Sequence, residues 1–136
     1  ETYIDKEPYQ AFEDIQIDYK YEIINSDHYD IGVFDVGHRG IVELRNVDDE
    51  TGTFGVEMTF KTLKDGEVSK GGGLYYILSG ETKEYIIDYD IDSGEDVEWS
   101  YKVIPGKKTI TKPVTKYRDV EKTRMVTKYK QEYKCD

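Results

Sequence analysis

The chain has 136 residues, one Cys, and 29 acidic against 19 basic side chains, which gives a net charge of -10. This length suits a single domain. The longest apolar run, residues 74–78, is far shorter than the ~20 residues of a membrane-spanning helix, so we expect no membrane insertion. There are 35 β-branched residues and 13 Tyr, whereas Ala occurs once and Leu four times. This composition favours strands over helices.

Alternation of apolar and polar residues, typical of a strand with one buried face, recurs along the chain. The clearest strand is residues 54–60, where Phe54, Val56, Met58 and Phe60 are separated by small or polar residues. Val42 and Leu44 are likewise expected to share one buried face. In chain order, the predicted strands cover residues 15–23, 29–36 (with a bulge near Gly32), 42–45, 54–60, 74–78, 85–91 and 97–103. We find no convincing helical pattern.

Turn-forming residues separate these strands at short intervals. The predicted turns are residues 25–28, 48–52, 65–66, 79–80 and 92–94. Such short connections leave no room for helical crossovers between parallel strands, so neighbouring strands should be antiparallel. The sequence therefore predicts an all-β fold, an antiparallel two-sheet sandwich of about seven strands with extended N- and C-terminal segments.

The two ends of the chain differ from the middle. In the tail, Val114, Tyr117 and Val120 recur every third residue, a spacing that continues to Val126 and Tyr129. Three residues per turn is the polyproline II period. Residues 1–22 have net charge -5 and residues 107–130 have +7, so we expect the ends to run side by side as a ribbon leaving the sandwich. The alternative left open is that both are disordered.

These differences predict three parts: an extended acidic segment (residues 1–12), a sandwich domain (13–106) and a basic tail rich in Val, Thr and Tyr (107–136). We expect the tail to lie on its own domain and not on nucleic acid, because the acidic body would repel phosphate. The lone Cys135 allows no internal disulfide, so it could pair either between two chains or with a Cys outside this sequence. The cellular compartment stays open on this ground.

Catalytic patterns are weak. His28 is predicted in a turn and His38 in a Gly-flanked loop, so we expect structural or solvated roles for both. The triplet Asp92-Ser93-Gly94 is that of aspartic proteases, where Ala normally follows; here Glu95 follows, so a hairpin turn is the better interpretation. We therefore expect no enzyme.

Carboxylates gather between residues 88 and 96, and calcium prefers six to eight oxygen ligands. The run resembles the start of an EF-hand loop, but Ser93 and Trp99 stand where Gly and Glu are required. The candidate metal site is a loop-end calcium site made of Asp92, Glu95 and Asp96. The alternative is an ordinary solvated face. Residues 48–50 are a second acidic loop, expected at the opposite end of the sandwich.

Two further patterns suggest ligands. Residues 70–73, Lys-Gly-Gly-Gly, precede a strand and not a helix, so a hairpin loop is favoured over a phosphate-binding loop. Tyr75 and Tyr76, with Trp99 and Tyr101, could form an aromatic platform for sugars. Trp99 and Tyr101 alternate with polar residues, however, which favours burial in the core.

Residues 42–48, 52–56, 78–82 and 99–103 together resemble the immunoglobulin-like or fibronectin-III-like modules of archaeal and bacterial cell-surface proteins. The resemblance covers about half the chain and implies an extracellular, non-catalytic structural or protein-interaction module. Its expected partners are another protein or neighbouring domains of a longer parent chain. The alternative function is a carbohydrate- or calcium-binding module. Otherwise we expect no cofactor.

Overall fold

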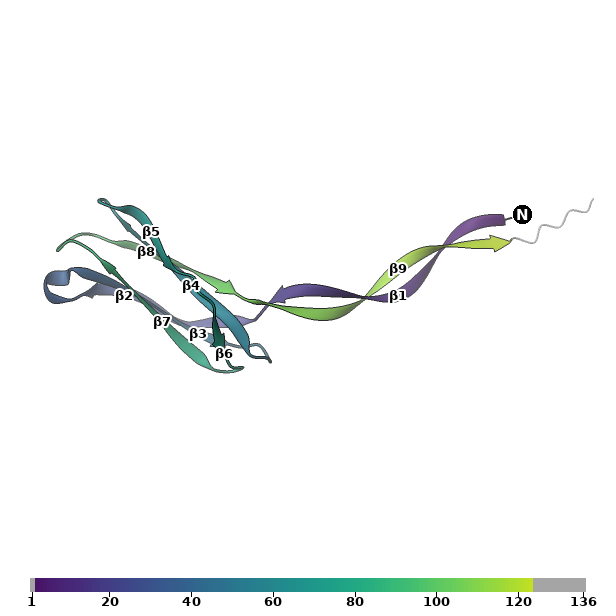
Figure 1. Ribbon diagram of the computed structural model, residues 1–136, viewed down its shortest axis with the longest axis horizontal. Helices are drawn as coiled ribbons and strands as arrows, with labels where there is room; N and C mark the ends of the chain where they lie inside the picture. The colour runs from purple at the N-terminus through teal and green to yellow at the C-terminus, as the bar shows by residue number, and fades with distance from the viewer. Residues whose placement is uncertain (1, 124–136) are drawn as a thin grey trace, which may run out of the picture. The chain divides into compact units, whose positions relative to one another are not determined.

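The computed structural model describes residues 2–123, which form nine strands and one short 3-10 helix. No helix in this part of the chain has the length and apolarity needed to cross a membrane. In chain order (Figure 1), the elements are β1 (Thr2–Asp18), β2 (Tyr21–Ile31), η1 (Val33–Asp35), β3 (Gly37–Asn46), β4 (Gly52–Thr62), β5 (Gly66–Gly71), β6 (Tyr75–Ile77), β7 (Thr82–Asp90), β8 (Glu98–Pro105) and β9 (Lys107–Thr123).

Strands β2 to β8 form two antiparallel sheets, which confirms the predicted all-β sandwich. The strand list differs from the prediction, because β5 was not predicted and the predicted strands 15–23 and 29–36 both overlap β2. The first sheet has the order β2-β3-β7. In the second sheet β4 pairs with β8 along one edge, while β5 and β6 follow one another along its other edge. The edge strands of the first sheet are therefore β2 and β7. The edges of the second sheet are β8 on one side and β5 with β6 on the other.

The core lies between β3 and β7 of one sheet and β4 and β6 of the other. Phe54, Val56, Met58 and Phe60 are all buried, as their alternation predicts, and so are Val42 and Leu44 of the facing sheet. Period-two alternation places these side chains on the inner faces. Each fully buried side chain of this size stabilises the fold by roughly 1.5 to 3 kcal/mol relative to exposure.

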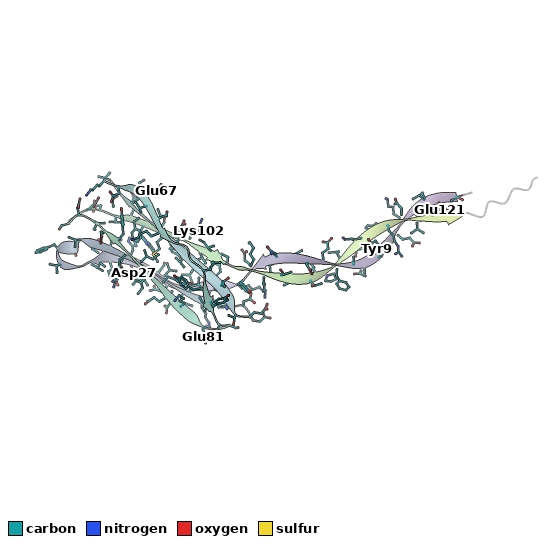
Figure 2. All side chains as sticks on the ribbon, in the orientation of Figure 1. Tyr9, Asp27, Glu67, Glu81, Lys102 and Glu121 are labelled. Atoms are coloured by element: carbon teal, nitrogen blue, oxygen red, sulfur yellow. The ribbon has the colours of Figure 1, made fainter. Side chains whose placement is uncertain are left out.

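The ends of the chain pair as a two-stranded ribbon of β1 and β9 (Figure 1). Ion pairs join Lys107 to Asp18 and Lys116 to Glu13, each between a base of the tail and an acid of the N-terminal segment, as the predicted charge complementarity requires. A third pair, Lys6 with Asp119, has the opposite polarity. The polyproline II interpretation is wrong for this part of the tail, because residues 107–123 are a β-strand paired with β1. Val126, Tyr129 and Cys135 lie outside the described residues. Figure 2 shows the ribbon's side chains, Tyr9 and Glu121 among them, standing out from the strands.

The described residues divide into two compact units, one of residues 16–109 and one of residues 2–15 with 110–123. The predicted boundaries at residues 13 and 106 differ from these by three residues at each end. The predicted strand 15–23 is in fact interrupted at Tyr19 and Lys20, where β1 ends and β2 begins. Backbone bonds from Tyr19 N–H to Gly106 O and from Val47 N–H to Lys20 O hold this junction.

The β2–β3 hairpin differs most from the prediction. The turn predicted at residues 25–28 is part of β2, and the loop predicted at residues 37–40 opens β3. The strand predicted for residues 29–36 ends at Ile31, and the register shift lies between Ile23 and Asn25, not near Gly32. Polar residues on the inner side of β2 hide its strand pattern, and the actual turn, residues 33–36, is apolar except for Asp35.

Candidate functional site

The predicted calcium ligands lie in the β7–β8 connection, which forms a tight turn. Glu95 N–H donates to Asp92 O at 3.0 Å, and Asp92 N–H donates to the Glu95 carboxylate at 2.9 Å. Lys64 Nζ lies 3.1 Å from Asp92 Oδ2. This confirms the predicted turn and gives two of the carboxylates protein partners. Asp92, Glu95 and Asp96 do not form a group of ligand atoms within 4.8 Å of one another, and the calcium site stays a prediction.

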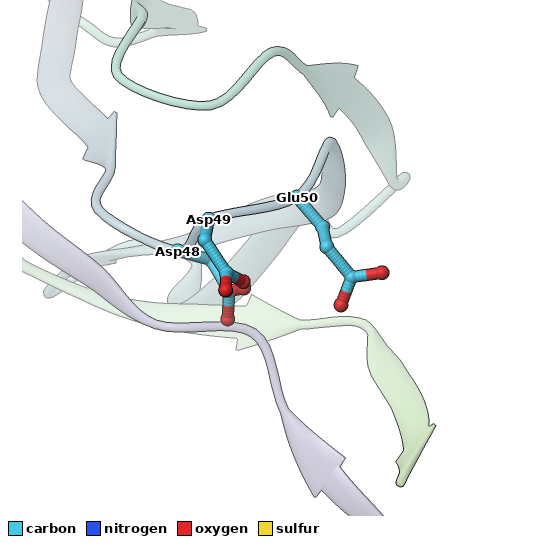
Figure 3. Close-up of side chains that lie close together, drawn as sticks. All are labelled: Asp48, Asp49 and Glu50. Atoms are coloured by element: carbon cyan, nitrogen blue, oxygen red, sulfur yellow. The ribbon is translucent and has the colours of Figure 1, made fainter.

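Within residues 2–123, the carboxylates that do gather this closely are Asp48, Asp49 and Glu50 in the β3–β4 loop (Figure 3). The register of β3 with β7 places this loop at the opposite end from Asp92, as predicted. An ammonium group already lies among these carboxylates: Lys108 Nζ is 2.6 Å from Asp48, 2.9 Å from Glu50 and 3.4 Å from Asp49. The cluster is therefore an ion-paired loop anchor.

Asp48 is the buried member of this anchor. Burial alone would raise the pKa of its carboxyl group, but hydrogen bonds from Lys108 Nζ and from Lys20 N–H outweigh burial and hold the pKa well below its usual range. Hydrogen bonds to Asp48 and Glu50 raise the pKa of Lys108. The Asp48 backbone is fixed as well, since its carbonyl oxygen accepts from Ser79 Oγ and its N–H donates to Asn46.

The chain's two histidines meet on the inner face of the β2–β3 hairpin. His38 is buried and lies between Asp30 and His28, with Nδ1 2.7 Å from Asp30 Oδ1 and Nε2 2.9 Å from His28 Nδ1. His28 also stacks on the Trp99 ring of β8, with centroids 5.0 Å apart. Every ring nitrogen of His38 thus has a partner, which is what burial of a polar ring requires. This arrangement anchors edge strand β2.

The β2–β3 turn is an exposed apolar tip, defined here as Val33, Phe34, Asp35 and Val36. The exposed fractions are 74% for Val33 and 80% for Phe34, and Val36 is also exposed. Phe34 and Asp35 have positive φ angles of 65° and 55°. For a bulky residue such as Phe this left-handed conformation is strained. The alternation of residues 29–36 gave no signal of it, because the same residues also fit a bulged strand.

Hydrogen bonds hold the tip in this conformation. Ser93 Oγ donates to Phe34 O at 2.7 Å, and Ile91 N–H donates to Val36 O at 2.9 Å. Both donors belong to the connection that carries the predicted calcium ligands. The acidic β7–β8 connection therefore supports the apolar tip from the side.

Trp99 and Tyr101 pack against the core while staying partly exposed, so the predicted burial is partly correct. The Trp99 indole N–H is buried without a hydrogen-bond partner in the described part of the chain. It lies against Gly40, where any side chain would collide with the indole. Trp99 is thus fixed between the edges of the two sheets, whereas Tyr75 and Tyr76 are exposed.

A hollow opens on the other side of the sandwich, between β7 and the segment that joins β5 to β6. Its volume is about 140 Å³. The predicted hairpin loop contributes Gly71, Gly72 and Gly73 to its wall, and β6 and β7 contribute the rings of Tyr75 and Tyr85. Tyr85 is held by donating its hydroxyl to Phe54 O at 2.6 Å, and burial raises its pKa to about 12.

No protein-family model matches the sequence, and a search of the curated proteins finds no significant match. The predicted relationship to immunoglobulin-like modules therefore stays a prediction. We infer the function from the geometry of the tip, the hollow and the anchors described above.

Proposed function

We propose that this protein is a non-catalytic protein-interaction module that contacts its partner through the apolar tip. The observation that carries the proposal is Phe34, whose side chain is 80% exposed while its backbone has φ +65°. A non-glycine residue in this conformation costs on the order of 1 to 3 kcal/mol. Because the ring is exposed, its burial does not offset this cost in the folded state. We therefore infer that the ring serves binding.

The tip is also preorganised for contact. Its carbonyl groups are bound by Ser93 and Ile91, so little conformational entropy is left to lose when a partner binds. A single aromatic anchor that enters a pocket is the usual centre of a protein interface. The expected partner surface is thus an apolar pocket that accepts Phe34.

The charges around the tip narrow the class of partner. Asp35 lies within the tip, Asp90 pairs with Gly37 at its base, and the β7–β8 connection beside it carries Asp92, Glu95 and Asp96. Such an acidic setting favours a pocket with a basic rim. It disfavours insertion into an anionic lipid surface, which attracts basic segments.

The resemblance of residues 42–105 to cell-surface modules supports a place in a longer extracellular chain. The runner-up function, binding of carbohydrate or calcium, has weaker support. The residues named for it are engaged within the protein, since Asp92 pairs with Lys64 and Trp99 stacks on His28. The tip offers an apolar surface that the fold itself does not use.

The substitution Phe34→Gly tests whether the ring serves folding or binding. Because Gly adopts positive φ without steric cost, we expect the free energy of unfolding in urea to stay unchanged or to rise by up to about 1 kcal/mol. Val33 is equally exposed and has no positive φ, so Val33→Gly is the matched control, with an expected loss of about 0.5 to 1 kcal/mol.

A loss of more than about 1 kcal/mol for Phe34→Gly would mean that the ring stabilises the fold, and it would remove the basis of the proposal. A glycan screen and a calcium titration of the full chain test the runner-up. A glycan would favour the carbohydrate-binding module if it binds the chain and if Trp99→Ala abolishes this binding without unfolding the protein.

A further inference from the structure

The hollow between β7 and the β5–β6 segment has the size of an aromatic ring. Its volume of about 140 Å³ is close to the roughly 150 Å³ of an apolar cavity that holds benzene. Three consecutive glycines leave this space because they contribute no side chains. At Gly71 a side chain would collide with Val56 O and Ile87, so the close approach of this backbone to the core depends on glycine.

The lining of the hollow is apolar and aromatic. Val56, Ile86 and Ile87 line it together with the rings of Tyr75 and Tyr85. The two rings are tilted against each other with centroids 6.1 Å apart. Tyr75 and Ile86 are about half exposed, so the hollow is open to an incoming side chain. Aromatic walls of this kind favour a third ring in edge or offset contact.

A basic group stands at the rim. Lys83 Nζ lies 5.1 Å from the Tyr75 ring centroid and 5.4 Å from that of Tyr85. A second hollow of about 370 Å³ adjoins the first and is lined by Tyr75, Lys83, Glu84, Tyr85 and Ile86. An apolar hollow with a lysine beside it matches the partner surface expected for the tip, in which Asp35 follows Phe34 directly.

We propose that the tip of one copy of this chain docks into the hollow of a second copy, with Phe34 in the apolar hollow and Asp35 beside Lys83. This inference rests on the proposed function and names its partner. The tip is bound to Ile91 and Ser93 of its own chain, and none of its residues lines the hollow. The tip therefore does not fill the hollow of its own chain, and in the proposed contact a second copy supplies it.

The geometry of this contact determines the assembly. Tip and hollow are different patches of one molecule, so the contact is heterologous and each docked copy keeps one tip or one hollow free. Assembly then continues beyond the dimer, either to a closed ring or to an open row. A two-fold symmetric dimer would instead require both copies to exchange tips reciprocally within one interface, which would leave no tip and no hollow free.

Sedimentation velocity of the full chain tests the proposal. We would use up to about 1 mM protein at about 0.15 M salt, which screens repulsion between acidic copies. A reducing agent excludes disulfides through Cys135. We expect species larger than a dimer that grow with concentration. Phe34→Ser should weaken the association by roughly 10- to 100-fold, the effect of exposing one buried Phe ring. Leu63→Ser, which removes a fully exposed apolar residue from the β4–β5 turn, is the matched control and should change nothing.

A second variant blocks the hollow. A Cβ at Gly73 would meet only the Tyr75 ring, at 3.7 Å or more, so Gly73→Leu should fold while its side chain fills the space. Alone, the Phe34→Ser and Gly73→Leu chains should each be monomeric. Mixed, they should form a one-to-one complex, because one supplies a hollow and the other a tip. Introduced as a single substitution, Lys83→Glu should weaken self-association relative to the unaltered chain, whereas Lys102→Glu should not.

The proposal is overturned if the chain stays monomeric at about 1 mM, if Phe34→Ser and Leu63→Ser behave alike, or if the mixed variants do not combine. If the chain does not self-associate but co-sediments with phosphatidylcholine vesicles, and Phe34→Ser abolishes this co-sedimentation, the tip binds membranes instead. These failures leave the unfolding result for Phe34→Gly unaffected, so they can be told apart from failure of the proposed function.

Discussion

The ribbon of β1 and β9 and the sandwich of β2 to β8 are both made of paired strands, yet they are stabilised differently. In the sandwich, alternate residues of β4 such as Phe54 and Phe60 are fully buried. In the ribbon, Phe12 and Tyr117 are mostly exposed, and the strands are joined by ion pairs such as Lys116 with Glu13. Strand pairing alone therefore does not make a core, which forms only where a second sheet covers the apolar side of the first.

The difference also has an energetic side. Exposed ion pairs contribute between about 0 and 1 kcal/mol each, whereas a buried aromatic residue contributes several times more. We therefore expect the sandwich to determine the global stability of the protein, and the ribbon to open locally at much lower cost. Three measurements sharpen this comparison.

The largest effect is expected from a matched pair of Phe→Ala substitutions. Phe60→Ala empties a fully buried site and should lower the free energy of unfolding by about 3 to 5 kcal/mol in urea denaturation. Phe12→Ala in the ribbon removes a ring that is 71% exposed and should cost less than about 0.5 kcal/mol. Equal losses for the two variants would contradict the distinction between the regions.

An intermediate effect is expected at the Asp48–Lys108 anchor. Asp48→Asn keeps the shape but removes the charge that pairs with Lys108, and should cost about 1 to 3 kcal/mol at pH 7. Because folding lowers the pKa of Asp48 from its ordinary 3.8, its contribution is complete above pH 3.8 and is lost as pH falls through the lowered value. Urea midpoints measured from pH 7 to pH 2 should thus fall less steeply in Asp48→Asn than in the unaltered chain. Parallel curves would show that the charge does not stabilise the loop.

The smallest effect is expected in the ribbon. Lys116→Met removes the pair with Glu13, which also raises the pKa of Lys116. The urea midpoint of the sandwich should not change, while amide hydrogen exchange in residues 110–120 should accelerate by a few-fold. The control substitution is Lys102→Met in the sandwich, where the contact of Lys102 with Glu57 is 4.0 Å long. A lower sandwich midpoint for Lys116→Met would mean that the two regions unfold together.

Much of the fold could be predicted from the sequence, because the clearest alternation coincides with the central strand β4 and short turns exclude crossovers. The tail was misassigned for a physical reason. Its period of three reflects where Val and Tyr occur, whereas the conformation is set by pairing with β1, which lies more than 100 residues away in the sequence. Such long-range pairing leaves no local signal.

The candidate site was harder to predict. His28 and Asp30 are polar residues on the inner face of an edge strand, so they break the apolar alternation that marks a strand. At the tip the sequence misleads in the opposite direction, because the apolar residues Val33 and Phe34 suggest burial but are exposed. The acidic residues of the β7–β8 connection suggest calcium in the sequence, and only the structure shows that Ser93 of this connection donates a hydrogen bond to Phe34 O of the tip. Sequence patterns show which residues are apolar and not which of them the fold leaves uncovered.

The stack of His28 on Trp99 has an optical consequence. Trp99 is the only tryptophan in the chain, so fluorescence excited at wavelengths that tryptophan absorbs and tyrosine does not reports on this one site, despite the 13 tyrosines. Its indole spans the gap between β8 of one sheet and β2 of the other, with ring centroids 5.0 Å apart. Separation of the two edges would remove the imidazole from the indole face and change the emission. The protein thus carries a built-in fluorescent probe for the opening of its sandwich.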